Sequence, residues 1–96
     1  MNIFDDKQSG YKFCMKNVKN FEGINDYGLI KWCKQYLKEE STFIDIGAHI
    51  GTYSIILSKK CKKVVSFEPE KNSFECLAIN TCINTTTCNN KRSIKF

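Results

Sequence analysis

The 96-residue chain is poor in several residue types that point to particular functions. It has one proline, one tryptophan and one histidine, His49, and its six cysteines include no C-x-x-C pair. Zinc ligands usually occur in pairs about two to four residues apart, so this pattern argues against a metal site. No apolar run approaches the roughly 20 residues of a transmembrane helix, so no membrane span is expected.

Arginine is scarce as well. Lysine and arginine together number 15 and give a net charge of +5, but Arg92 is the only arginine. Proteins that read nucleic acid favour arginine, because its planar head contacts bases and phosphates bidentately. Lysines on solvated faces are the simpler interpretation, and we expect no nucleic-acid partner. The alternative, RNA or DNA binding through the lysines, predicts a steep salt dependence.

The first ten residues are polar and lack the apolar segment of a secretory signal. An even number of cysteines is compatible with disulfides, but without export the thiols should stay reduced. A cytoplasmic location is therefore expected.

The hydrophobic pattern predicts an α/β protein with a parallel sheet, because strands and helices alternate and crossovers between parallel strands are right-handed. Residues 1–25 are expected to form an N-terminal extension with a hairpin, and 26–96 a partial Rossmann-like domain. Asn72 and Glu75 resemble a capping box for the last helix. The expected elements are strands at 11–15 and 18–21, a helix at 26–38, a strand at 42–46, a helix at 51–60, a strand at 62–67, a helix from 72 to 82, a polar loop at 85–91 and a strand beginning at 93–96.

A glycine turn follows the first core strand in the pattern Asp45-x-Gly47-x-x-x-Gly51. Gly47 permits a positive φ and leaves room for a ligand against the backbone, and Gly51 permits close approach where the helix begins. The second core strand ends in Glu68, and an acid at that position can accept both hydroxyls of a ribose. The combination predicts a nucleoside-type ligand.

The identity of that nucleoside follows from charge. A dinucleotide site usually shows G-x-G-x-x-G, whereas this turn lacks the middle glycine. Asp45 disfavours a pyrophosphate and suits a cationic ligand with an amino group and a sulfonium. S-adenosylmethionine (SAM) is therefore favoured over NAD, which remains the alternative.

Three stretches appear in order: F-I-D-I-G-A-H-I-G-T-Y-S-I, V-V-S-F-E-P-E and F-E-C-L-A-I-N-T-C-I-N. Together they resemble the front half of the FkbM family of SAM-dependent methyltransferases, over residues 26–84. The resemblance implies a Rossmann-like class I methyltransferase fold, here a truncated parallel sheet with flanking helices. It also implies O-methylation of a sugar or other small-molecule acceptor.

The resemblance carries roles over to individual residues. Asp45 and Gly47 would border the methionine part of the cofactor, and Ala48 and His49 would form the floor of the turn. Glu68 would hold the ribose, and Pro69 and Glu70 would flank the adenine. No catalytic residue is assigned. The predicted cofactor-binding set is Asp45, Gly47, Ala48, His49, Gly51, Glu68 and Pro69.

The resemblance departs from the family in length. Family members continue with further strands that carry the acceptor side, so we expect this chain to hold the cofactor half and to be inactive alone. The alternative is a non-enzymatic module that binds SAM or a partner. The outer edge of strand 42–46 is expected to be unpaired, which favours self-association.

Overall fold

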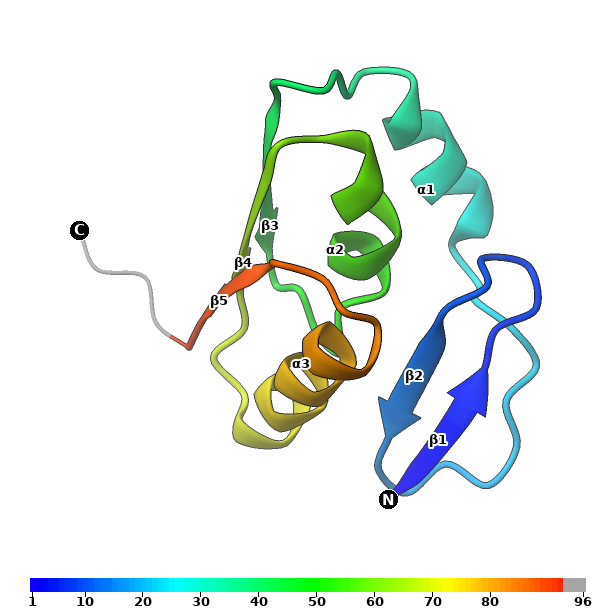
Figure 1. Cartoon of the computed structure of the whole chain (residues 1–96). Coiled ribbons are helices and arrows are strands. Elements are labelled where there is room, and N and C mark those ends of the chain that lie inside the picture. Colours follow the sequence, from blue (N-terminus) through cyan, green and yellow to red (C-terminus); the bar gives the residue numbers. More distant parts are fainter. Residues whose placement is uncertain (93–96) are drawn as a thin grey trace.

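The computed structural model describes residues 1–92 and shows two small sheets and three α-helices (Figure 1). The first sheet is an N-terminal hairpin, and the second has the order β3-β4-β5. In chain order the elements are β1 (Asn2–Asp5), β2 (Lys12–Met15), α1 (Tyr27–Lys34), β3 (Thr42–Ile46), α2 (Thr52–Leu57), a 3₁₀ turn (Ser58–Lys60), β4 (Lys63–Phe67), α3 (Lys71–Ile83) and β5 (Asn89–Lys91).

The second sheet is parallel throughout. β3 and β4 pair in register from Thr42 with Lys63 to Ile46 with Phe67, and β5 joins the other side of β4. The carboxyl ends of these strands therefore lie at one edge of the sheet. The predicted α/β class with a parallel sheet and flanking helices is confirmed.

All three helices lie on the same side of this sheet (Figure 1). Val64 and Ser66 of β4 point to the helices and are buried, whereas Ile44 and Ile46 of β3 are 57% and 70% exposed. Helix α2 contributes its buried Ile55, Ile56 and Leu57 to a core that also draws residues from β2, α1 and α3. Among the described residues, the other face of the sheet carries no helix.

The hairpin is attached to α3 through two asparagines. Asn80 accepts a hydrogen bond from the Cys14 amide at 2.6 Å, and Asn84 accepts one from the Lys12 amide at 2.9 Å. The Asn84 side chain also donates to the Lys12 carbonyl at 2.7 Å. Asn80 and Asn84 are four residues apart on the helix, a rise of about 6 Å, and Lys12 and Cys14 are two residues apart on the strand, a rise of about 6.7 Å. Because these spacings match, the two asparagines reach alternate residues of β2.

The structure corrects the predicted hairpin. β2 pairs antiparallel with β1, with Ile3 opposite Cys14, and not with residues 18–21. Three of the four side chains of β1 are exposed, and its sequence does not alternate apolar and polar residues. The pattern that would predict a half-buried strand is therefore missing.

Two further predictions need correction at α3 and β5. The first turn of α3 is capped by Glu70, whose side chain accepts from the Asn72 and Ser73 amides, so Asn72 and Glu75 form no capping box. The segment predicted as a loop contains β5, whose residues are polar and pair through the backbone. The strand expected at 93–96 lies outside the described residues.

The predicted helix 26–38 is shorter in the structure, where α1 ends at Lys34. The division of the chain at residue 25 stays a prediction. Within residues 1–92, each helix is too short or too polar to cross a bilayer.

Candidate functional site

The turn from β3 into α2 is fastened to the end of β4. The amides of Gly47 and Ala48 both donate to the Phe67 carbonyl at 2.9 Å. Three residues of the turn have left-handed backbone conformations, with φ of 78° at Gly47, 56° at His49 and 97° at Gly51. The chain thus changes direction tightly at the carboxyl edge of the sheet, as the glycine spacing predicts.

The two glycines have different surroundings. A Cβ at Gly51 would lie 2.7 Å from Leu77 Cδ1, so this glycine lets α2 begin close to α3. A Cβ at Gly47 would meet nothing within 4 Å. The space beside Gly47 is therefore open among the described residues, and only the backbone conformation calls for glycine there.

Glu68 joins the turn to the end of β4. Its Oε1 accepts a hydrogen bond from the His49 amide at 2.8 Å, and its Oε2 accepts one from the Glu70 amide at 2.9 Å. The residue is 7% exposed. A carboxylate has about four acceptor positions, so each oxygen keeps capacity for a ligand hydroxyl. Sequence reasoning placed Glu68 at a ligand but missed its attachment to the turn.

Asp45 lies on β3 beside two serines that the sequence analysis did not select. Its Oδ2 accepts from Ser54 Oγ at 2.6 Å, and Ser54 Oγ lies 2.6 Å from Ser66 Oγ. Burial raises the pKa of Asp45, the Ser54 hydrogen bond opposes that rise, and the charge of Glu68 adds to it. Both serines are fully buried, on the core-facing sides of α2 and β4, and a polar residue at a core position is the sequence signal for such a contact.

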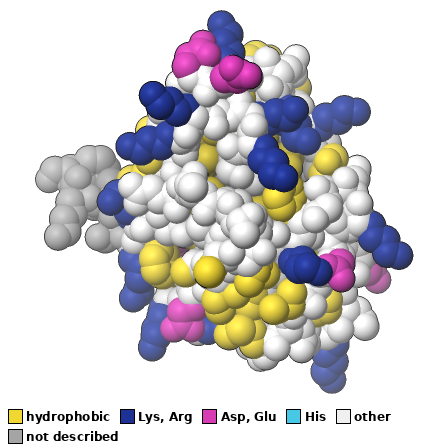
Figure 2. Space-filling view, in the orientation of Figure 1, with side chains coloured by type: hydrophobic (Ala, Val, Ile, Leu, Met, Phe, Trp, Pro, Cys, Tyr) yellow, Lys and Arg dark blue, Asp and Glu magenta, His cyan; other side chains and the backbone are white. Residues whose placement is uncertain are grey.

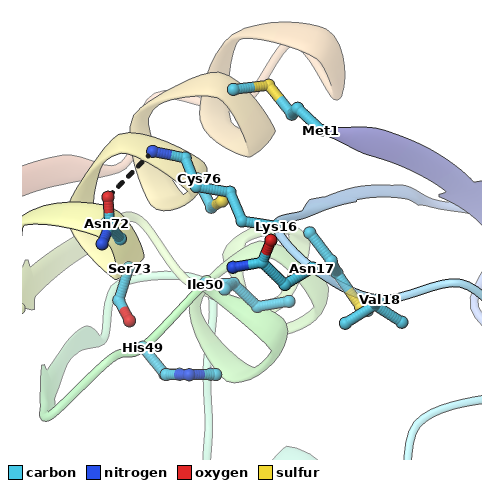
Figure 3. Close-up of a pocket in the computed structure, with 10 residues that line it drawn as sticks. Met1, Lys16, Asn17, Val18, His49, Ile50, Asn72, Ser73 and Cys76 are labelled. Atoms are coloured by element: carbon cyan, nitrogen blue, oxygen red, sulfur yellow. Dashed lines mark hydrogen bonds between the residues drawn. The ribbon is translucent and has the colours of Figure 1, made fainter.

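Two hollows flank the turn. The first has a volume of about 480 Å³ and lies between the turn, α3 and the hairpin (Figure 3). The second has about 400 Å³ and is bounded by the segment from Asn20 to Asp26. Met15, His49 and Ile50 line both.

The structure therefore separates the predicted set into two groups. His49 lines the hollows, whereas Asp45, Gly47 and Glu68 lie along the sheet edge and line neither. Pro69 follows Glu68, and its carbonyl accepts a hydrogen bond from Arg92 at 3.0 Å. Within residues 1–92, no three His, Cys, Asp or Glu side chains gather as a metal site would require.

Solved structures of other proteins share this fold. Trm5b from Pyrococcus abyssi matches with a TM-score of 0.79 and 17% identity, over 95% of this chain and 27% of its own. The Pyrococcus abyssi tRNA (uracil-54, C5)-methyltransferase, solved with S-adenosyl-L-homocysteine, matches with a TM-score of 0.73 and 17% identity, over 95% and 24%. The complex of aTrm5 and tRNALeu matches with a TM-score of 0.77 and 19% identity, over 95% and 27%.

These likenesses establish the fold of SAM-dependent methyltransferases. The chain spans about a quarter of the length of these three neighbours. No protein-family model matches the sequence, and no curated protein sequence matches it. The FkbM resemblance is thus supported at the level of the methyltransferase fold.

The neighbours contradict the prediction that nucleic acid is not a partner. They include tRNA methyltransferases, and one was solved together with tRNA. The prediction was wrong because it relied on the scarcity of arginine, which argues only against bidentate base reading. Lysine binds phosphate as a point charge, so a lysine-rich composition leaves RNA backbone contacts open.

Proposed function

We propose that this chain binds SAM at the carboxyl edge of β3 and β4, as the cofactor half of a methyltransferase. The observation that carries the proposal is the Glu68 carboxylate, which holds the His49 amide of the glycine turn at 2.8 Å. The contact joins an acid suited to ribose to a turn that lets a ligand approach the backbone. Open space beside Gly47 leaves room for the methionine part of SAM.

The charges of this edge favour SAM over a dinucleotide. The carboxylates of Asp45 and Glu68 lie at the carboxyl ends of neighbouring strands, and the charge of Glu68 contributes to the raised pKa of Asp45. Two acids repel a pyrophosphate and attract the ammonium and sulfonium of SAM. His49 occupies a position where a dinucleotide turn needs the smallest side chain.

RNA is the acceptor class that we propose. The support is the group of tRNA methyltransferases among the structural neighbours, together with the net charge of +5. Lysine and arginine side chains are spread over the visible face and do not form one patch (Figure 2). Such a surface suits contacts with a phosphate backbone, which are independent of base sequence.

The V-V-S-F-E-P-E segment supports a second candidate, O-methylation of a sugar or other small molecule, through its resemblance to the FkbM family. A non-enzymatic module that binds the cofactor is the remaining alternative. The two acceptor classes differ in one measurable respect, because only RNA binding weakens steeply as salt is raised.

Calorimetric titration with S-adenosylhomocysteine tests the cofactor site, with circular dichroism on the same samples. Wild type and Glu40→Ala, a change in an exposed loop, should bind equally. Asp45→Asn and Glu68→Gln keep side-chain shape and should weaken binding about tenfold or more, since each removes a charge or a ribose acceptor. NAD should not compete. A folded wild-type chain that ignores the ligand would refute the proposal.

The acceptor class is tested by filter binding of unmodified tRNA to the chain saturated with S-adenosylhomocysteine. Affinity should fall by about tenfold or more between 50 and 200 mM salt, as counterion release requires. Binding of a sugar acceptor with no affinity for tRNA would instead support the FkbM-like function.

A further inference from the structure

The first hollow is an open concavity bounded by three separate parts of the chain. The turn contributes His49 and Ile50, α3 contributes residues of its first two turns, and the segment after β2 contributes Lys16 to Val18 (Figure 3). Met1 closes another side. A volume of about 480 Å³ lies within the range of small-ligand sites, roughly 300–1,000 Å³.

Two positive groups beside this hollow, the Lys16 ammonium and the amino end of α3, already have partners. Lys16 is paired with Glu75 and also donates to Asn72 Oδ1 at 3.2 Å. Two amides in the first turn of α3, those of Asn72 and Ser73, donate hydrogen bonds to the Glu70 carboxylate at 3.1 and 2.7 Å. A phosphate or carboxylate would have to displace these partners, so the hollow suits an uncharged ligand.

The remaining lining groups suit a planar heterocycle. Asn17 and Ser73 offer both donors and acceptors, and Asn72 offers its amide donors while its Oδ1 already accepts from Lys16. These groups match the edges of nucleobases. Met1 and Met15 supply thioethers, and sulfur contacts with aromatic rings are favourable. Neutral amides around an apolar floor are the chemistry that recognises an unpaired base.

The hollow is also next to the carboxyl edge of β3 and β4, where we propose that the cofactor binds. His49 donates its backbone amide to Glu68, while its side chain lines the hollow (Figure 3). Its φ of 56° is unusual for a residue with a side chain, and Asn17, which lines the same hollow, has a φ of 60°. Such conformations gather at ligand sites, where the fold maintains them.

We propose that this hollow binds the acceptor nucleobase of the RNA substrate, held by Asn17 and Asn72 across the turn from the cofactor. This proposal rests on the proposed function, since it assumes SAM on the Glu68 side of the turn. His49 then stands between the two ligands.

The test measures binding of guanosine, adenosine, cytidine and uridine to the full chain saturated with S-adenosylhomocysteine, by saturation-transfer NMR. Asn17→Gly removes the side chain while tolerating the left-handed backbone, and Asn72→Ala removes the second amide. Each should weaken binding of the preferred nucleoside about tenfold. Asn89→Ala, an exposed asparagine on β5, is the control and should bind within about twofold of wild type.

Each other outcome has a defined meaning. Equal nucleoside affinity in wild type, Asn17→Gly and Asn72→Ala overturns the proposal, as does the absence of nucleoside binding. A nucleoside that binds the free chain but not the chain saturated with S-adenosylhomocysteine also overturns it, because the hollow would then hold the cofactor's own adenine. Failure to bind S-adenosylhomocysteine, with nucleoside binding intact, instead refutes the cofactor proposal.

Discussion

Asp45 and Glu75 are carboxylates with opposite electrostatic surroundings. Burial raises the pKa of Asp45 above its ordinary value of 3.8, whereas the hydrogen bond from Lys16 lowers the pKa of Glu75 below 4.5. The ionised form of Asp45 is thus disfavoured by folding, and that of Glu75 is favoured. A buried acid that costs stability is expected where a ligand supplies the compensating charge.

The first prediction concerns the pH dependence of stability. Between 3.8 and the raised pKa of Asp45, the folded chain binds more protons than the unfolded chain, so stability falls as pH rises through this window. Asp45→Asn removes that loss and keeps an acceptor for Ser54. The difference in stability between this variant and wild type should therefore favour the variant more at neutral pH than in acid. Thermal unfolding of both proteins across the pH range measures this difference.

Glu75→Gln is the control with the opposite sign. The lowered pKa of Glu75 contributes stability above 4.5 that is lost as pH falls through the folded pKa. Relative to wild type, this variant should lose more stability at neutral pH than in acid. The same sign for both variants would contradict the assigned surroundings.

The second prediction concerns the two glycines of the turn. Gly51→Ala introduces a methyl group 2.7 Å from Leu77 Cδ1 at a φ of 97°. The strained backbone and the overpacking together should lower the free energy of unfolding by roughly 2–4 kcal/mol. Gly47→Ala carries only the backbone strain and should cost about 1–2 kcal/mol. Urea denaturation measures both, and a larger loss for Gly47→Ala would contradict the packing described.

At the scale of elements, α3 connects the hairpin to the glycine turn. Besides holding Cys14, Asn80 donates to the Ile50 carbonyl at 2.8 Å, so one buried side chain contacts both parts. Asn84 contacts only β2 and the carbonyl of Asn80. The hairpin wall of the first hollow is therefore positioned by the helix that also borders it.

The third prediction follows from the difference between these asparagines. Asn80→Ala leaves buried backbone groups of Cys14 and Ile50 unpaired and should cost about 3 kcal/mol. Asn84→Ala should cost about 1 kcal/mol, because water can reach the Lys12 backbone. Urea denaturation gives the losses, and hydrogen exchange should accelerate at Lys12 in the second variant. Unchanged exchange there would contradict docking through Asn84.

The elements predicted best are those with apolar side chains at regular spacing. The bounds of β3 are as predicted and those of β4 differ by one residue, because β-branched and aromatic residues form compact runs in both. β1 is short and mostly exposed and β5 is polar, and both are held by backbone pairing, which apolar periodicity does not report. The same holds for the candidate site. The sequence pattern indicated its glycines and strand-end acids, but it did not indicate that Glu68 accepts a hydrogen bond from a backbone amide of the turn.

At the scale of the whole molecule, the helices within residues 1–92 cover one face of the parallel sheet (Figure 1). Ile46 of β3 is 70% exposed on the open face, and Ile56 of α2, on the covered side of the sheet, is 4% exposed. The hydrophobic effect scales with the area removed from water, so equal side chains at these positions contribute unequally to stability.

The fourth prediction compares the two faces. Ile46→Thr should change the free energy of unfolding by less than about 0.5 kcal/mol, since its side chain is already in water. Ile56→Thr buries a hydroxyl in the core and should cost about 2–4 kcal/mol. Thermal or urea unfolding distinguishes them, and comparable losses would show that the open face is covered in solution.

The hydrogen bonds that Asn80 and Asn84 of α3 make with β2 engage main-chain atoms of the strand. Asn84 meets the amide and carbonyl of Lys12, groups that nearly every amino acid possesses. Mutational drift at position 12 can therefore proceed without loss of docking, with proline as the exception because it lacks the amide hydrogen. Selection on these hydrogen bonds should act on the asparagines of the helix, whereas Phe13 and Cys14 of β2 are constrained by their burial in the core.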